Sequence, residues 1–311
     1  MRPPQRTSLA LTRVSPGSPS LQTIADLFAR SKQIVAITGA GISTAAGIPD
    51  FRSKNGLYAN GELFRQSSFN GPESSKILQT TLQLRDTVLR CEPTKTHQWL
   101  VSLQSKLRRW YTQNIDMLEQ KAGLSLDIDN INDQSRCIPL HGSLAWLKCN
   151  FCHGNFEWDE YRKNIQAGRD LPCARCARRC DDRVVAGLRR TTTIGQLQPS
   201  IIMSDTPYHP QGGDIAELFQ RDREAPTDIL LILGTSLKRE GPKQQVRLFA
   251  QHVRAQGGMV VYVNATKPAN LGNGLVDYWV DWECDEWVFD LLGRQQACRP
   301  GSTREHPIVI D

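Results

Sequence analysis

The sequence contains no apolar run that approaches the roughly 20 residues needed to cross a lipid bilayer. It also has no N-terminal segment typical of a secretory signal, although it contains nine cysteines. Cysteines outside the secretory route are more often metal ligands or thiols than disulfides. We therefore expect a protein without a membrane partner, acting in a reducing compartment.

Acidic residues are absent from the first twenty positions, which include four prolines and three arginines. This composition predicts a disordered tail over residues 1–20. A mitochondrial presequence is similar in composition and is the alternative, but the prolines would interrupt its amphipathic helix. Residues 293–311 are polar and predict a second tail, to which we assign no role.

The net charge of +6 and the isoelectric point near 8.9 make the chain mildly basic. Such a charge suits an acidic or nucleic-acid-associated partner but does not show one, and an ordinary solvated basic surface accounts for it at least as well. We therefore expect no direct sequence-specific binding of nucleic acid.

Continuous apolar runs at residues 33–38, 228–233 and 259–263 predict parallel strands that are buried on both faces. Helical spacing near 21–28, 76–89, 96–107 and 244–255 alternates with strand-like runs, including 109–113 and 200–203. Ser20 is the expected cap of the first helix. The pattern predicts an α/β fold with a doubly wound, Rossmann-like parallel sheet over residues 21–292.

A glycine-rich turn, Gly39-Ala40-Gly41, directly follows the first predicted strand. Glycines allow the backbone to approach a pyrophosphate, and this layout favours a dinucleotide. The usual fingerprint needs a third small residue where Thr44 stands, so an ordinary strand-to-helix turn is the alternative. An NAD-linked oxidoreductase would also require an acid after its second strand, and none is convincingly placed.

Four cysteines form two Cys-x-x-Cys pairs, at Cys149 and Cys152 and at Cys173 and Cys176. This spacing predicts a structural zinc ion with four thiolate ligands, in an inserted zinc-ribbon and helical module at about 145–195. Cys180 lies close enough in sequence to replace Cys176 as the fourth ligand. We interpret His153, which directly follows Cys152, as a surface residue.

Five ordered motifs resemble those of the sirtuins, the NAD-dependent protein-lysine deacylases. They are Gly39-Ala40-Gly41-Ile42-Ser43 running on to Gly47-Ile48-Pro49-Asp50-Phe51-Arg52, then Thr112-Gln113-Asn114-Ile115-Asp116, His141-Gly142, the double Cys-x-x-Cys, and Gly234-Thr235-Ser236. The resemblance covers about residues 21–290 and is nearest to the nuclear fungal branch that deacetylates histones. It implies NAD as co-substrate and Cys176 as the fourth zinc ligand.

The resemblance also implies roles for individual residues. The implied NAD-binding residues are Gly39, Ala40, Gly41, Asp50, Phe51, Arg52, Gln113, Asn114, Ile115, Asp116, Gly234, Thr235, Ser236, Asn264 and Cys284. Asn114 would orient the nicotinamide ribose, and His141 would act as the general base, although a lone histidine is more often structural. We assign His97 to helix capping and packing.

The implied reaction transfers the acyl group of an acetylated lysine to ADP-ribose and releases nicotinamide, and the implied substrate is a histone in the nucleus. Mitochondrial or cytoplasmic placement is the alternative location. ADP-ribosyl transfer, removal of longer acyl groups and a non-catalytic, zinc-bearing NAD-binding chromatin scaffold are the alternative functions. Two departures concern Met117, where the family commonly has glycine, and residues 203–207, where it has an aromatic-Gly-Glu run. The second places the peptide preference in doubt.

Overall fold

The computed structural model describes residues 11–49, 73–103, 105–126, 131–189, 193–202, 212–238, 240–268 and 274–297. The chain forms two compact units. Unit 1 contains residues 1–45, 93–111 and 217–311, and unit 2 contains residues 46–92 and 112–216. Each unit is therefore assembled from separated parts of the chain.

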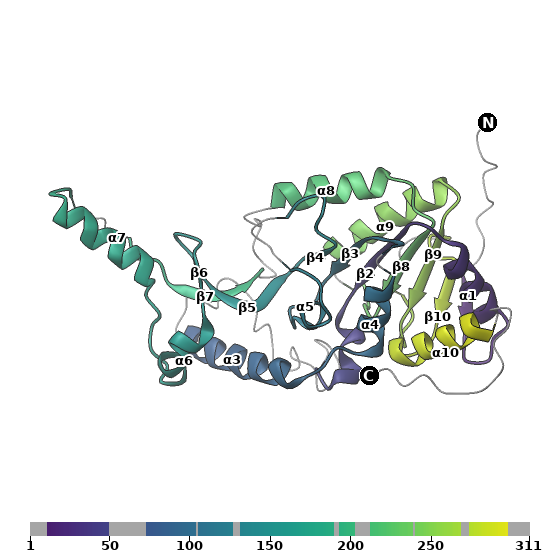
Figure 1. The fold of residues 1–311 in the computed structure, drawn as a ribbon, viewed down its shortest axis with the longest axis horizontal. Coiled ribbons are helices and arrows are strands. Elements are labelled where there is room, and N and C mark those ends of the chain that lie inside the picture. The colour runs from purple at the N-terminus through teal and green to yellow at the C-terminus, as the bar shows by residue number, and fades with distance from the viewer. Residues whose placement is uncertain are drawn as a thin grey trace. The chain divides into compact units, whose positions relative to one another are not determined.

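Unit 1 is built on a largely parallel sheet (Figure 1). Its strands are β1 (Thr12–Val14), β2 (Ile34–Thr38), β3 (Leu107–Thr112), β8 (Ile229–Leu233), β9 (Met259–Val263) and β10 (Tyr278–Val280). They lie in the order β1-β10-β9-β8-β2-β3, and β1 to β2 in this order are joined by parallel pairs. This arrangement confirms the predicted Rossmann-like sheet, and it brings the carboxyl ends of β2, β8 and β9 to one edge.

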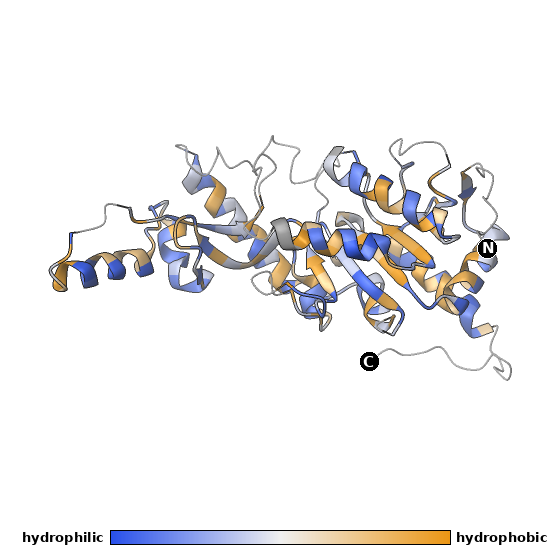
Figure 2. Ribbon diagram, turned by 90° about the horizontal axis from the view of Figure 1, so that it is seen from above, coloured by the Kyte–Doolittle hydropathy of each residue, from blue (hydrophilic) through white to orange (hydrophobic). Residues whose placement is uncertain are grey.

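The central strands are apolar because helices cover both of their faces. Every residue of β2, β8 and β9 is buried, and Figure 2 shows these strands as largely apolar ribbons. One group of helices contains α1 (Ser20–Arg30), α4 (Lys95–Ser102) and α10 (Cys284–Ala297), and the other contains α8 (Gly212–Glu224) and α9 (Glu240–Ala255). Phe28, Trp99 and Trp287 pack edge to face within the first group, and Phe219 packs on Phe249 in the second.

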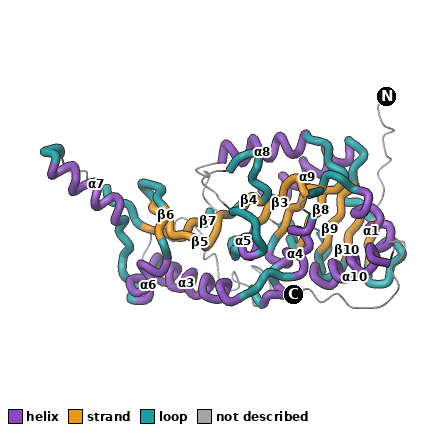
Figure 3. The backbone as a smooth tube through the Cα atoms, in the orientation of Figure 1, coloured by secondary structure: helices purple, strands orange, loops and turns teal. Residues whose placement is uncertain are grey.

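Unit 2 contains a small antiparallel sheet with strand order β6-β5-β7 (Figure 3). The elements of this unit are α3 (Ser74–Arg90), α5 (Leu118–Lys121), β4 (Cys137–Pro139), β5 (Gly142–Cys149), β6 (Asn155–Phe156), α6 (Trp158–Gln166), α7 (Ala174–Val185) and β7 (Leu197–Ile201). The run predicted at 200–203 thus contributes to an antiparallel strand. Cys149 ends β5 and Cys152 lies in the following turn, whereas Cys173 is the N-cap residue of α7 and Cys176 lies within that helix.

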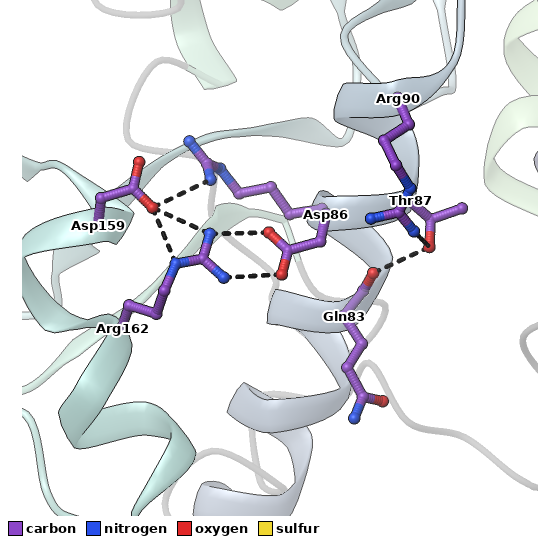
Figure 4. Close-up of polar contacts among 7 residues, drawn as sticks. Gln83, Asp86, Thr87, Arg90, Asp159 and Arg162 are labelled. Atoms are coloured by element: carbon purple, nitrogen blue, oxygen red, sulfur yellow. Dashed lines mark hydrogen bonds and ion pairs between the residues drawn. The ribbon is translucent and has the colours of Figure 1, made fainter.

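An ion-pair cluster joins α3 to α6 within unit 2 (Figure 4). Arg162 donates two hydrogen bonds to Asp86, at 2.7 and 2.8 Å, and also pairs with Asp159. The hydrogen bond from Arg162 lowers the pKa of Asp86. The bidentate geometry fixes the relative orientation of the two helices more firmly than a single contact would.

Three predicted boundaries are wrong. Residues 12–14, which we assigned to a disordered tail, form the edge strand β1, where Val14 is fully buried. The helix α10 continues to Ala297, beyond the predicted limit at 292. Ser20 is the first residue of α1, and Pro19 occupies the cap position. A three-residue strand is too short to produce a recognisable sequence period.

Candidate functional site

The glycine turn of unit 1 packs directly against the chain that follows β8. Gly39 and Gly41, at the 3-10 turn η1 (Ala40–Ile42), donate their N–H groups to the carbonyl oxygens of Leu233 and Gly234, at 3.0 and 2.8 Å. A Cβ atom on Gly41 would lie 2.6 Å from the Cα atom of Gly234, and one on Gly39 would lie 2.8 Å from the Cβ atom of Thr235. Both glycines are therefore required by contact between two backbones, whether or not a ligand is bound.

The ends of β8 and β9 place further predicted residues at this same sheet edge. Tyr262 donates a hydrogen bond to the carbonyl oxygen of Thr235 at 2.7 Å, which anchors the turn after β8. Ser236 and Asn264 are partly exposed, so both side chains can be reached from solvent. Open α/β sheets bind ligands at such an edge, which agrees with the predicted dinucleotide site.

Cys284 and Asp285 are the first two residues of α10. Cys284 is buried, with its thiol toward the carbonyl oxygen of Val263 at 3.9 Å. Asp285 accepts the N–H groups of Lys95 and Thr96 at 3.1 and 3.0 Å and therefore caps the start of α4. Sequence reasoning missed this cap because Lys95 and Asp285 are 190 residues apart in the chain.

His97 has the structural role that the sequence predicted. Thr94 and His97 form a reciprocal capping box at the start of α4, and the imidazole is fully buried. Burial lowers the pKa of His97 to about 4, against the opposing charge of Asp285. The ring is therefore neutral at physiological pH.

In unit 2 the motif after β3 forms a tightly held loop. Asn114 and Asp116 are nearly buried, with 3% and 6% exposure, and Gln113 is half-buried. The carbonyl oxygen of Ile115 accepts the N–H group of Leu144 at 3.0 Å, which ties the loop to β5. Met117 adopts φ 62°, a left-handed conformation that explains why glycine is common at this position in the resembled family.

His141 is positioned between the ends of two strands. The preceding Leu140 donates its N–H group to the carbonyl oxygen of Thr112 at 2.8 Å, and Ile202 donates to the carbonyl oxygen of His141 at 2.9 Å. Gly142 has φ 77°, and a Cβ atom there would lie 2.3 Å from a backbone oxygen of β7. The glycine thus lets β5 approach β7 while the partly exposed His141 stays beside the Asn114 loop.

The four predicted metal ligands gather around a single point. The sulfur atoms of Cys149 and Cys176 are 3.8 Å apart, and those of Cys152 and Cys173 are 3.7 Å apart. All four lie within 4.8 Å of one another. Four ligands at the usual Zn–S length of about 2.3 Å would be separated by roughly 3.8 Å in a tetrahedron. The residues therefore fit a closed, structural zinc site.

Cys180 is buried on α7 but does not belong to this four-sulfur group. His153 is exposed, as predicted for a surface residue. Gly195 had no predicted role, yet a Cβ atom there would lie 2.4 Å from the sulfur atom of Cys149. The predicted cofactor residues Asp50, Phe51 and Arg52, and the departure at 203–207, lie outside the described residues.

Together these features define an α/β protein with a ligand-binding sheet edge and a four-cysteine zinc module. The sequence of residues 39–240 matches that of the Sir2 family. The chain belongs to the Sir2 family, which confirms the resemblance to the sirtuins.

Two fungal relatives cover most of the chain. HST3 of Candida albicans, named an NAD-dependent histone deacetylase, is 36% identical over 296 residues, or 86% of this chain and 61% of that protein. HST4 of Saccharomyces cerevisiae, named likewise, is 37% identical over 255 residues, or 76% of this chain and 68% of that protein. The chain thus spans about two thirds of the length of these relatives.

Solved structures of Sir2 enzymes share the fold. One, from work on the mechanism and regulation of these enzymes, has a TM-score of 0.68 at 22% identity and covers 90% of this chain and 99% of its own. A Sir2 homologue bound to 2'-O-acetyl ADP ribose has the same TM-score at 24% identity, covering 88% of this chain and 96% of its own. Among the described residues, no helix combines the length and apolar character needed to cross a membrane.

Proposed function

We propose that this chain is an NAD-dependent protein-lysine deacetylase that acts on histones in the nucleus. The observation that carries the proposal is the arrangement in unit 2, where backbone hydrogen bonds hold His141 and the Asn114 loop at the end of β3. The names of the fungal relatives, histone deacetylases that use NAD, support the substrate and the location.

The residues of the two units suit distinct tasks in this reaction. Bound NAD would supply a glycosidic bond whose cleavage releases nicotinamide. The turns at Gly39 and Gly234 would hold its phosphates and adenosine, Asn114 would orient the ribose, and Asp116 would accept a hydrogen bond from the amide of nicotinamide. His141 would remove a proton from a ribose hydroxyl group, a general-base role that typically accelerates a reaction roughly 10²- to 10⁴-fold. The zinc ion would stabilise the fold and take no part in the chemistry.

The test measures release of nicotinamide and of free lysine from a library of acylated peptides. We expect both products in equal amounts, no NADH absorbance, and loss of turnover in His141→Ala with NAD binding retained. His153→Asn is the matched control, because His153 is exposed at φ 55° and asparagine tolerates that conformation. Turnover of His141→Ala within about tenfold of the parent would exclude the base role.

The same library separates the alternatives. Faster removal of longer acyl groups than of acetyl would make the chain a long-chain deacylase. Transfer of labelled ADP-ribose to protein would make it an ADP-ribosyltransferase. For the location, a reporter fused to residues 1–30 should not enter mitochondria, and its import would contradict nuclear action.

A further inference from the structure

A buried pair of polar side chains lies beneath the Asn114 loop of unit 2. Thr112, the last residue of β3, and Glu119, on α5, are both fully buried. The hydroxyl group of Thr112 donates a hydrogen bond to Oε1 of Glu119 at 2.5 Å and accepts one from the N–H group of Asn114 at 3.0 Å. A continuous chain of hydrogen bonds thus connects the carboxyl group of Glu119 to the backbone of Asn114.

The same loop is fixed at its other end by a second carboxyl group. Oδ1 of Asp116 accepts the N–H group of Leu118 at 3.1 Å, at the start of α5. The polar contacts of Thr112 and Asp116 therefore hold the loop on both sides of the left-handed Met117. The loop has little freedom as long as both contacts are present.

A fully buried carboxyl group is costly unless it has a specific partner. Among the described residues, Glu119 makes no ion pair with a basic side chain. Burial, and then the neighbouring charge of Asp116, raise the pKa of Glu119 to about 8. Glu119 therefore serves at neutral pH mainly as a hydrogen-bonding group.

We propose that Thr112 and Glu119 are positioning residues that hold the Asn114–Asp116 loop in the conformation needed for catalysis. Neither touches the reacting atoms; both act through the backbone of Asn114. The inference rests on the proposed function, because that function makes Asn114 and Asp116 the contacts of the ribose and of nicotinamide. Small displacements of such contacts reduce rates strongly, since the reacting groups must be aligned.

The principal variant is Thr112→Val, which keeps the shape of the side chain and removes its hydroxyl group. We expect kcat to fall about ten- to a hundredfold while KM for the peptide changes little, because one buried hydrogen bond to the loop is lost. Thr112→Ser restores the hydroxyl group and should restore kcat. Glu119→Gln keeps the acceptor oxygen and should retain kcat within about threefold, whereas Glu119→Leu should resemble Thr112→Val.

Thr81→Val is the matched control, because Thr81 is also buried and its hydroxyl group bonds to a backbone oxygen within α3. If Thr81→Val and Thr112→Val lose the same stability but only Thr112→Val loses kcat, the effect is positional. The proposal would be overturned if Thr112→Val and the parent had the same kcat at a temperature below the unfolding midpoints of both.

Hydrogen exchange of the amides in residues 113–118 tests the inference without any assay of turnover. Exchange should be faster in Thr112→Val and close to that of the parent in Thr112→Ser, because the Asn114 amide loses its acceptor only in the first. Unchanged exchange in Thr112→Val would overturn the positioning role. A parent chain that does not deacetylate any peptide, but shows this exchange pattern, would overturn the proposed function alone.

Discussion

The identity of the fourth zinc ligand gives the sharpest prediction, because α7 contains two buried cysteines that are candidates for that position. Cys176 belongs to the four-sulfur group, whereas Cys180 lies one helical turn further along. Cys176→Ser should therefore lose the metal, and Cys180→Ser should keep it. Serine is a poor zinc ligand of nearly the same size, so the pair of variants compares coordination with packing alone.

The size of the effect follows from the geometry of the sulfur atoms. The separations of 3.7 and 3.8 Å match a preformed tetrahedron, so the folded chain gains the binding free energy without rearrangement. Structural zinc contributes on the order of 10 kcal/mol or more. Since a whole domain is stable by only about 5–15 kcal/mol, loss of the metal should unfold at least the cysteine-bearing part of unit 2.

Metal content per chain and thermal unfolding provide the assay. We expect one zinc ion in the parent and in Cys180→Ser, less than about a tenth of that in Cys176→Ser, and a melting transition of Cys176→Ser like that of the parent treated with a chelator. A full complement of zinc in Cys176→Ser together with its loss in Cys180→Ser would assign the fourth position to Cys180. Zinc retained in both variants would refute the four-thiolate site.

Two further predictions concern unit 1. The pKa of His97 is about 4 in the folded chain and 6.5 in the unfolded chain, so the unfolded chain binds the proton more readily. The free energy of unfolding should therefore fall by about 2 kcal/mol between pH 7 and pH 5. His97→Gln keeps a capping side chain without titrating, and urea unfolding at both pH values should show a smaller loss; equal losses would contradict the buried neutral state. Gly41→Ala should destabilise the chain by about 1–3 kcal/mol in the same assay, because the added methyl group meets the backbone at Gly234. Gly293→Ala, in open space on α10, should instead stabilise it by about 0.5–1 kcal/mol, and equal effects of the two changes would exclude the close contact.

The central part of the fold was predictable because its strands are buried on both faces. Continuous apolar runs marked β2, β8 and β9, and short elements escaped the same reasoning. β1 and β10 have three residues each; they pair with each other, and β10 also pairs with β9. Pairing between distant segments leaves no local pattern, so these strands could be found only in the structure.

The site was predictable where chemistry depends on residue type, as with the cysteine pairs and His141. It was not predictable where a residue acts through contacts that only the folded chain creates. The need for glycine at Gly39 comes from the turn after β8, and Glu119 acts on Asn114 through a hydroxyl group. The sequence of α5 is Leu-Glu-Gln-Lys, in which Leu118 is the only apolar residue, so no apolar pattern in it marks Glu119 as buried.

The pairing of β2 with β8 affects how the chain is made. Ile34 pairs with Ile229, so β2 leaves the ribosome about 195 residues before its partner, a delay of roughly 10–40 s at ordinary rates of synthesis. During that time β3 can pair with one edge of β2, but the backbone N–H and C=O groups at the other edge stay unpaired, and strands of other chains can pair with them. The glycine turn at Gly39 and Gly41 also cannot reach its native packing until the backbone at Leu233 and Gly234, on which it packs, has been synthesised. The nascent chain is therefore most exposed to aggregation, and most dependent on chaperones, in the interval before β8 is complete.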